Sequence, residues 1–135
     1  MLVEGDGALL RDSTGREYID GNSSIWTNIH GHNHPRLIEA LRSQAGKLCH
    51  ASFLGTSNEP AILLAHALVQ AAALAAPGQQ EPLERVFYSD DGSTAVEVAL
   101  KMAFQSRLQR GETPRTRFAA LRDGYHGDTI GAVSV

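Results

Sequence analysis

The sequence predicts an α/β fold, because strand-like and helix-like patterns alternate along its second half. A run rich in β-branched and aromatic residues at 85–89 gives way to helix formers, with apolar residues at helical spacing, through residue 105. A second short apolar run follows at 117–121. This order favours a βαβ unit with a right-handed crossover between two parallel strands. A hairpin pattern and two helical patterns come before it.

Composition narrows the class of protein. The chain has 135 residues, 42% of them hydrophobic, which is enough for one ordinary domain with a core. A net charge of −3 and a pI near 6.0 disfavour nucleic acid or an anionic membrane as the main partner. Cys49 is the single cysteine, which we interpret as a small, half-buried residue near a helix end. With no signal-like or membrane-length apolar run, we expect a cytoplasmic protein.

The first elements along the chain are a hairpin and a loop. Residues 7–20 contain two short strand patterns around the turn residues Asp12–Gly15, where Asp and Gly supply the turn chemistry. Residues 21–35 then lack periodicity and combine small polar residues with Trp26 and three histidines. We interpret this second stretch as a loop.

The histidines of this loop, His30, His32 and His34, alternate and leave two interpretations. Alternating imidazoles on one strand are able to bind a metal ion. The alternative is structural: neutral histidines bond to the loop backbone ahead of a helix that starts at Pro35. We favour the structural interpretation and expect no metal site, because no cysteine or carboxylate lies nearby in the sequence to complete a ligand set.

Two amphipathic helices follow. The first begins at Pro35 and runs to about Leu48, and the second begins near 58–60 and ends before the breaker pair 77–78. Their apolar residues fall on one face, so we expect both helices to pack in a core. Residues 79–82 have the composition of a surface connection. The helix of the βαβ unit also has residues that we expect in the core, namely Met102, Phe104 and Leu108.

The turn at 90–93 suits the binding of an anion such as a phosphate. The first amides of a helix have no partner within the helix, and its dipole places partial positive charge there. Gly92 lets the backbone approach a ligand, and Ser93 adds a hydroxyl donor. The plain alternative is an N-cap, because Thr94 and Glu97 have the spacing of a capping box. The residues alone do not separate the two interpretations.

Three further features concern the ends of the βαβ unit. We interpret Asp90 and Asp91 as turn and capping residues rather than an acid-base pair or magnesium ligands. This turn and residues 123–128 both follow strand-like runs, and ligands of parallel sheets bind at the carboxyl ends of strands, so one ligand could touch both. The chain stops in an apolar, strand-like run at 131–135, which we interpret as the mark of a truncated chain.

Four segments together resemble the class III pyridoxal-phosphate aminotransferases, a similarity that runs from about Val3 to the last residue. They are residues 26–35 (WTNIHGHNHP), 55–61 (GTSNEPA), 85–97 (RVFYSDDGSTAVE) and 124–129 (GYHGDT). Any one of these motifs would be a weak signal, but four of them in this order and at these separations make the resemblance specific.

This resemblance implies the α/β fold of the fold type I PLP-dependent transferases in incomplete form. Residues 1–49 would begin a small N-terminal domain, and residues 50–135 would be the opening part of the large cofactor domain. The cofactor implied is pyridoxal 5′-phosphate (PLP), and the assembly implied is a homodimer. The pattern fits the family members that transaminate 8-amino-7-oxononanoate in biotin synthesis, with adenosylmethionine or lysine as the amino donor.

The resemblance also assigns roles to single residues. Gly92 and Ser93 match the site for the cofactor phosphate, and Tyr125 matches the aromatic residue that lies against the pyridine ring. Trp26, Tyr125 and Asp128 match substrate-contacting positions. His126, beside Tyr125, is a candidate general base, but we interpret it as part of the pocket wall because a lysine moves the proton in this family.

The Schiff-base lysine of the family is not found in this sequence. The only lysines, Lys47 and Lys101, do not match the family's lysine motif, which in relatives comes after the segments matched here. We therefore expect no transamination by these 135 residues alone, weak PLP binding at most, and exposed apolar surface. Two alternatives remain: another class III aminotransferase acting on ω-amino acids or diamines, or a non-catalytic phosphate-binding module.

Overall fold

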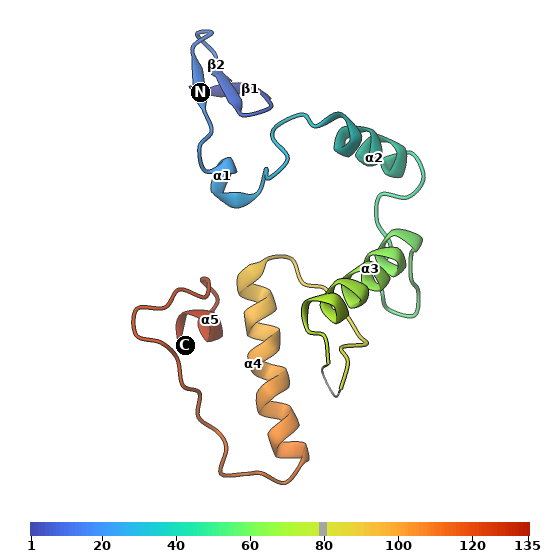
Figure 1. Cartoon of the computed structure of the whole chain (residues 1–135), viewed down its shortest axis with the longest axis vertical. Coiled ribbons are helices and arrows are strands. Elements are labelled where there is room, and N and C mark those ends of the chain that lie inside the picture. Colours follow the sequence, from blue (N-terminus) through green and yellow to red (C-terminus); the bar gives the residue numbers. More distant parts are fainter. Residues whose placement is uncertain (79–80) are drawn as a thin grey trace. The chain divides into compact units, whose positions relative to one another are not determined.

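The computed structural model describes residues 1–78 and 81–135. The chain forms two compact units, Met1–Glu59 and Pro60–Val135, each of which is described by itself (Figure 1). Residues 79 and 80 of the predicted surface connection lie outside the described part. The division into domains at residues 49 and 50 stays a prediction about a longer protein.

The first unit begins with a three-stranded antiparallel sheet in the order β1 (Leu2–Asp6), β2 (Leu9–Asp12), β3 (Glu17–Ile19). The predicted hairpin is confirmed, and β1 adds a strand that was not predicted. The Asp12 carboxylate fixes the turn between β2 and β3, because its Oδ1 accepts the amides of Thr14 at 2.9 Å and Arg16 at 3.0 Å.

Two helical elements follow the sheet in the first unit. Helix α1 (Ser23–Trp26) is a single short turn inside the predicted loop. Helix α2 (Pro35–Ala45) starts at the predicted proline, whose missing amide suits the first position, and it ends before the predicted Leu48.

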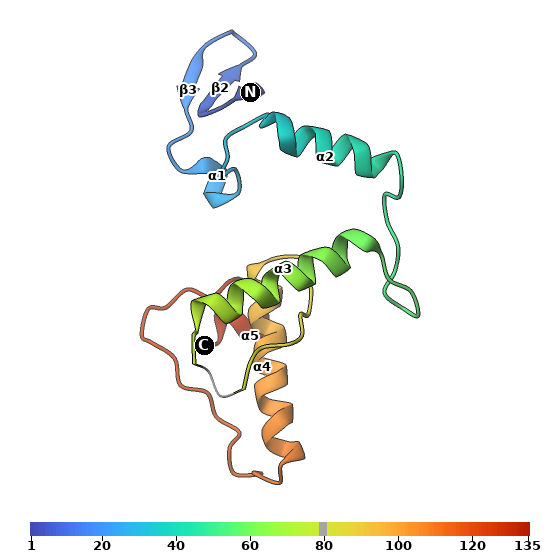
Figure 2. The ribbon, with the colours of Figure 1, turned by 45° about the vertical axis from the view of Figure 1, so that its right-hand side comes forward.

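The second unit is helical. Helix α3 (Glu59–Ala75) and helix α4 (Gly92–Gln109) agree with the predicted helices. The short helix α5 (Ile130–Val133) packs beside α4, as both ribbon views show (Figure 2). The Tyr88 hydroxyl donates a hydrogen bond of 2.6 Å to the Ala61 carbonyl and so ties the segment before α4 to α3.

Three predicted strands are wrong. Residues 85–89 and 117–121 carry no ladder hydrogen bonds, and the only sheet in the described residues is that of β1–β3. A strand needs a neighbour that satisfies its amides and carbonyls, and neither run is paired in a sheet within the described part of the chain. Residues 131–135 belong mainly to α5 rather than to a strand, because Glu97 accepts the Gly131 amide.

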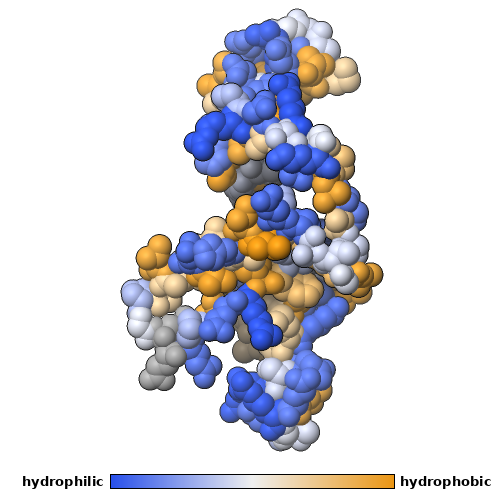
Figure 3. Space-filling view, turned by 90° about the vertical axis from the view of Figure 1, so that its right-hand side faces the viewer, coloured by the Kyte–Doolittle hydropathy of each residue, from blue (hydrophilic) through white to orange (hydrophobic). Residues whose placement is uncertain are grey.

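The expected core is also absent from the described residues, where Ala132 is the only buried hydrophobic residue. Hydrophobic side chains instead lie open on the surface (Figure 3). Cys49, which was expected to be half-buried, is exposed. Three residues of α4 that were predicted to face the core are also exposed: Met102 by 60%, Phe104 by 36% and Leu108 by 36%. Among the helices and strands of the described residues, their helix α4 packs against the short α5 alone, which covers too little of it. The predicted exposure of apolar surface is confirmed.

None of the helices in the described ranges combines the length and the apolar character needed to cross a membrane.

Candidate cofactor and substrate site

The N-terminus of α4 is capped by Asp91. Its backbone is extended, and its Oδ1 accepts the Thr94 amide and the Ser93 hydroxyl, each at 2.8 Å. The Thr94 hydroxyl in turn accepts the Asp91 amide at 3.0 Å. The capping box is therefore the pair Asp91 and Thr94, and the predicted pair of Thr94 and Glu97 is wrong. The Thr94 amide first, and then the Ser93 hydroxyl, lower the pKa of Asp91.

The same turn leaves donors for an anion. The Gly92 amide makes no hydrogen bond within the part of the chain that the structure describes. A Cβ added at Gly92 would meet nothing within 4 Å, so the backbone lies open to a ligand. The Ser93 hydroxyl donates to Asp91 and would turn away from it to reach a phosphate. These donors, at the start of an 18-residue helix, fit a phosphate group.

A second loop lies directly against this turn. Gly127 has a φ of +120°, and a Cβ at this position would collide with Ser93. The Thr129 hydroxyl donates a bond of 3.3 Å to the Ser93 carbonyl. The sequence predicted that one ligand could touch both the turn at 90–93 and residues 123–128. These contacts show that the two segments lie together, although the strand ends on which the prediction rested are not formed in the described residues.

Glu97 holds this second loop in place, a role that the sequence analysis missed. Its Oε2 accepts the Thr129 hydroxyl at 2.8 Å and the Gly131 amide at 2.7 Å. The Thr129 hydroxyl is the main cause of the lowered pKa of Glu97. One signal in the sequence was available: Glu97 lies one helical turn after Ser93 and so shares its face.

Two predicted substrate residues are joined within the loop. The Tyr125 hydroxyl donates a hydrogen bond of 2.9 Å to Asp128 Oδ2. This bond to a carboxylate raises the pKa of Tyr125 above its ordinary value of 10.0. The Tyr125 side chain is 72% exposed, which leaves the ring available for stacking. His126 lies over Gly124 of the same loop, with its Nε2 only 2.9 Å from where a Cβ of Gly124 would sit.

Trp26 belongs to the other unit, where it ends helix α1 and is 76% exposed. His32 of the same loop is bonded within the fold: its Nε2 lies 2.8 Å from Asp20 Oδ2, and its backbone pairs with that of Gly7. His32 is thus bonded within the fold, but its ring bonds to a side-chain carboxylate and not, as predicted, to the loop backbone. A carboxylate therefore does lie beside it, contrary to the expectation, but no three potential metal ligands gather among residues 1–78 and 81–135.

Comparison with known proteins covers the whole chain but only part of each relative. The family described as aminotransferase class III matches residues 1–135. An adenosylmethionine-8-amino-7-oxononanoate aminotransferase of Methanocaldococcus jannaschii is 46% identical over 100% of this chain and 28% of its own length. Proteins of the same name from Geobacter sulfurreducens and Nitratidesulfovibrio vulgaris are 48% and 51% identical, again over 100% of this chain and over 28% and 24% of their lengths. The chain thus spans less than a third of these relatives.

Solved structures agree with this result. The crystal structure of the Methanocaldococcus jannaschii enzyme matches with a TM-score of 0.90 and 47% identity over 100% of this chain and 29% of that one. An amine transaminase from an uncultivated Pseudomonas species, in its PLP-bound form, matches with a TM-score of 0.87 and 38% identity over 99% of this chain and 29% of that one. These matches confirm the predicted α/β fold class of the PLP-dependent transferases. The chain belongs to the class III PLP-dependent aminotransferases.

Proposed function

We propose that the chain is the N-terminal part of an aminotransferase that transfers an amino group to 8-amino-7-oxononanoate and forms 7,8-diaminononanoate, with PLP as its cofactor. The names of three relatives at 46%, 48% and 51% identity support this substrate and favour adenosylmethionine as the donor. The observation that carries the proposal is the packing of Gly127 and Thr129 against Ser93. This packing puts the turn with Gly92 and Ser93 beside the loop with Tyr125 and Asp128, which supports the proposal that they form one site.

Each proposed site residue has a separate task. The Gly92 amide and the Ser93 hydroxyl hold the cofactor phosphate, and the Tyr125 ring lies against the pyridine ring. Bound PLP supplies the aldehyde and the electron-withdrawing ring that carry the amino group. Asp128 fixes the Tyr125 hydroxyl at 2.9 Å and is a proposed substrate contact of the second unit. Trp26 is a separate proposed substrate contact, in the first unit.

The rest of the enzyme completes the site. Neither Lys47 nor Lys101 matches the family's Schiff-base lysine, so we infer that the active protein is longer than these 135 residues. In that protein, residues 1–49 begin the small domain and residues 50–135 begin the large one. The exposed apolar side chains, among them Leu121 at 83%, are then covered by further chain or by the second subunit of a homodimer.

Complementation tests the reaction. The full-length gene is expressed in a bacterial strain that lacks its own 8-amino-7-oxononanoate aminotransferase and therefore requires biotin. We expect growth on medium without biotin. Growth only when 7,8-diaminononanoate is supplied, with the full-length protein present in the cells, would overturn the proposal.

A second candidate is an amine transaminase that acts on ω-amino acids or diamines. It is favoured by the match to the Pseudomonas amine transaminase at 38% identity and a TM-score of 0.87. Purified full-length protein separates the two candidates when each acceptor is offered in turn. Product from 8-amino-7-oxononanoate alone supports the first candidate, and product only from ω-oxo acids or aldehydes supports the second.

A further inference from the structure

Helix α1 is a left-handed turn. Its four residues, Ser23 to Trp26, have φ values of 53°, 51°, 58° and 64°. L-residues are disfavoured in this region, because Cβ approaches the following carbonyl oxygen, and β-branched residues such as Ile25 are rarely found there. A run of such residues persists only where the surrounding structure holds it, and backbone strain of this kind gathers at functional sites.

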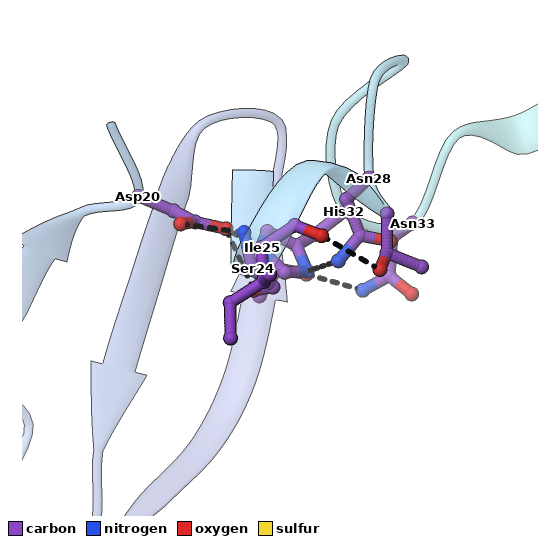
Figure 4. A network of polar contacts seen from close by, with 8 residues as sticks. Asp20, Ser24, Ile25, Asn28, His32 and Asn33 are labelled. Carbon is purple, nitrogen blue, oxygen red and sulfur yellow. Dashed lines mark hydrogen bonds and ion pairs between the residues drawn. The ribbon is translucent and has the colours of Figure 1, made fainter. Parts of the chain in front are cut away.

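The side chain of Asp20 holds the middle of this turn (Figure 4). Its Oδ1 accepts the Ser24 amide at 2.9 Å, and its Oδ2 accepts the Ser24 hydroxyl at 2.8 Å. The same Oδ2 lies 2.8 Å from His32 Nε2. The two side chains are only 7% and 17% exposed, so water does not replace these bonds easily.

The position of His32 is fixed by contacts with residues of the hairpin region and of its own loop. Its amide and carbonyl bond to the Gly7 carbonyl and amide at 2.8 Å and 3.0 Å. Its ring lies so close to Gly5 that a Cβ there would come within 2.7 Å of the ring Cγ. Asn28 links His32 to the turn. Its Nδ2 lies 3.4 Å from His32 Nδ1, and its backbone amide donates a hydrogen bond of 2.9 Å to the Ser23 carbonyl. A continuous chain of bonds thus runs from the sheet to the turn.

We propose that Asp20 and His32 are positioning residues that keep the turn Ser23–Trp26 left-handed and thereby set the direction of the Trp26 side chain. Trp26 is 76% exposed, so the turn presents its indole to whatever binds there. That this ligand is the amino acceptor rests on the proposed function, whereas the clamp itself rests on the bonds described above.

Trp26 is the only tryptophan of the chain, so its fluorescence reports on this turn alone. The test measures time-resolved fluorescence anisotropy of the 135-residue chain and of the variants Asp20→Asn and His32→Gln. Both variants should release the turn, and the amplitude of nanosecond depolarisation should rise roughly twofold. His30→Ala is the matched control, because His30 lies in the same loop and its ring faces His34 rather than the turn.

A double variant separates release of the turn from loss of the fold. Glycine adopts positive φ without a steric penalty, so Ile25→Gly in the Asp20→Asn background should restore part of the lost anisotropy. Unchanged anisotropy in Asp20→Asn and His32→Gln would overturn the proposal. A loss that Ile25→Gly does not reverse would also overturn it, because Asp20 would then support the fold and not the strained turn.

The use of the turn is measured separately in the full-length enzyme. If Asp20→Asn raises the KM for the acceptor severalfold while kcat stays near its normal value, Trp26 contacts the acceptor as proposed. If the anisotropy responds as expected but the KM does not, the clamp stands and the role of Trp26 in the proposed function fails.

Discussion

The two units differ in how the polar groups around their candidate site residues are hydrogen-bonded. In the first unit Asp20 bonds to both Ser24 and His32 at 2.8–2.9 Å and so holds the turn that ends at Trp26. In the second unit the start of α4 leaves the Gly92 amide without a partner in the described residues. A closed network fixes the direction of one side chain, whereas an open helix end can receive a ligand.

The largest effect on stability is expected at Gly127, where the second loop packs against the start of α4. Gly127→Ala should lower the free energy of unfolding by about 1–3 kcal/mol, because φ is +120° and the new Cβ would collide with Ser93. Urea denaturation measures the change. Gly21→Ala, whose Cβ would meet nothing within 4 Å, is the control and should change stability little. Equal stability of both variants would mean that the two loops of the second unit are not packed together.

Glu97→Gln should loosen the same contact without a collision. An amide accepts the Thr129 hydroxyl and the Gly131 amide less strongly than the carboxylate, which now holds them at 2.8 Å and 2.7 Å. Hydrogen exchange of the Gly131 amide should become roughly tenfold faster. Glu112→Gln, beyond the C-terminal end of α4, is the control and should leave that exchange rate unchanged.

Ser93→Ala tests whether the open helix end takes a phosphate. Removing one donor to a charged phosphate should weaken PLP binding by about tenfold, as measured by fluorescence titration of the full-length protein. Ser106→Ala is the matched control, because the Ser106 hydroxyl donates 2.9 Å to the Ala103 carbonyl within α4. Equal affinities for PLP in both variants would remove Ser93 from the phosphate site.

The smallest effect is expected when acid protonates Asp12 in the hairpin of the first unit. The Thr14 hydroxyl, followed by the Tyr18 hydroxyl, lowers the pKa of Asp12 from 3.8 to about 2. The ionised carboxylate therefore stabilises the turn fully above pH 4, and this contribution is lost as the pH falls from about 4 to about 2. Amide chemical shifts of Thr14 and Arg16 should follow this titration. In Asp12→Asn they should stay constant over the same range, and a titration centred at 3.8 in the unmodified chain would contradict the prediction.

Local signals in the sequence predicted much of this protein correctly. The Asp and Gly of Asp12–Gly15 set the turn of the hairpin, Pro35 sets the start of α2, and four short motifs indicate the family. The two turns of the candidate site do lie together, although the strands from which that proximity was predicted are not formed in the described residues. The signals for the hairpin turn and for the start of α2 lie within a few residues of the features that they predict, so those two predictions needed no knowledge of distant contacts.

The tertiary structure alone decided the rest. Glu97 reaches Thr129 and Gly131 across 32 and 34 positions, and this contact keeps residues 130–133 helical although their composition is strand-like. The left-handed turn before Trp26 depends on His32, which lies 12 positions beyond Asp20. Apolar periodicity predicted helices with a core face, but burial requires a second surface, and periodicity carries no information on where that surface comes from.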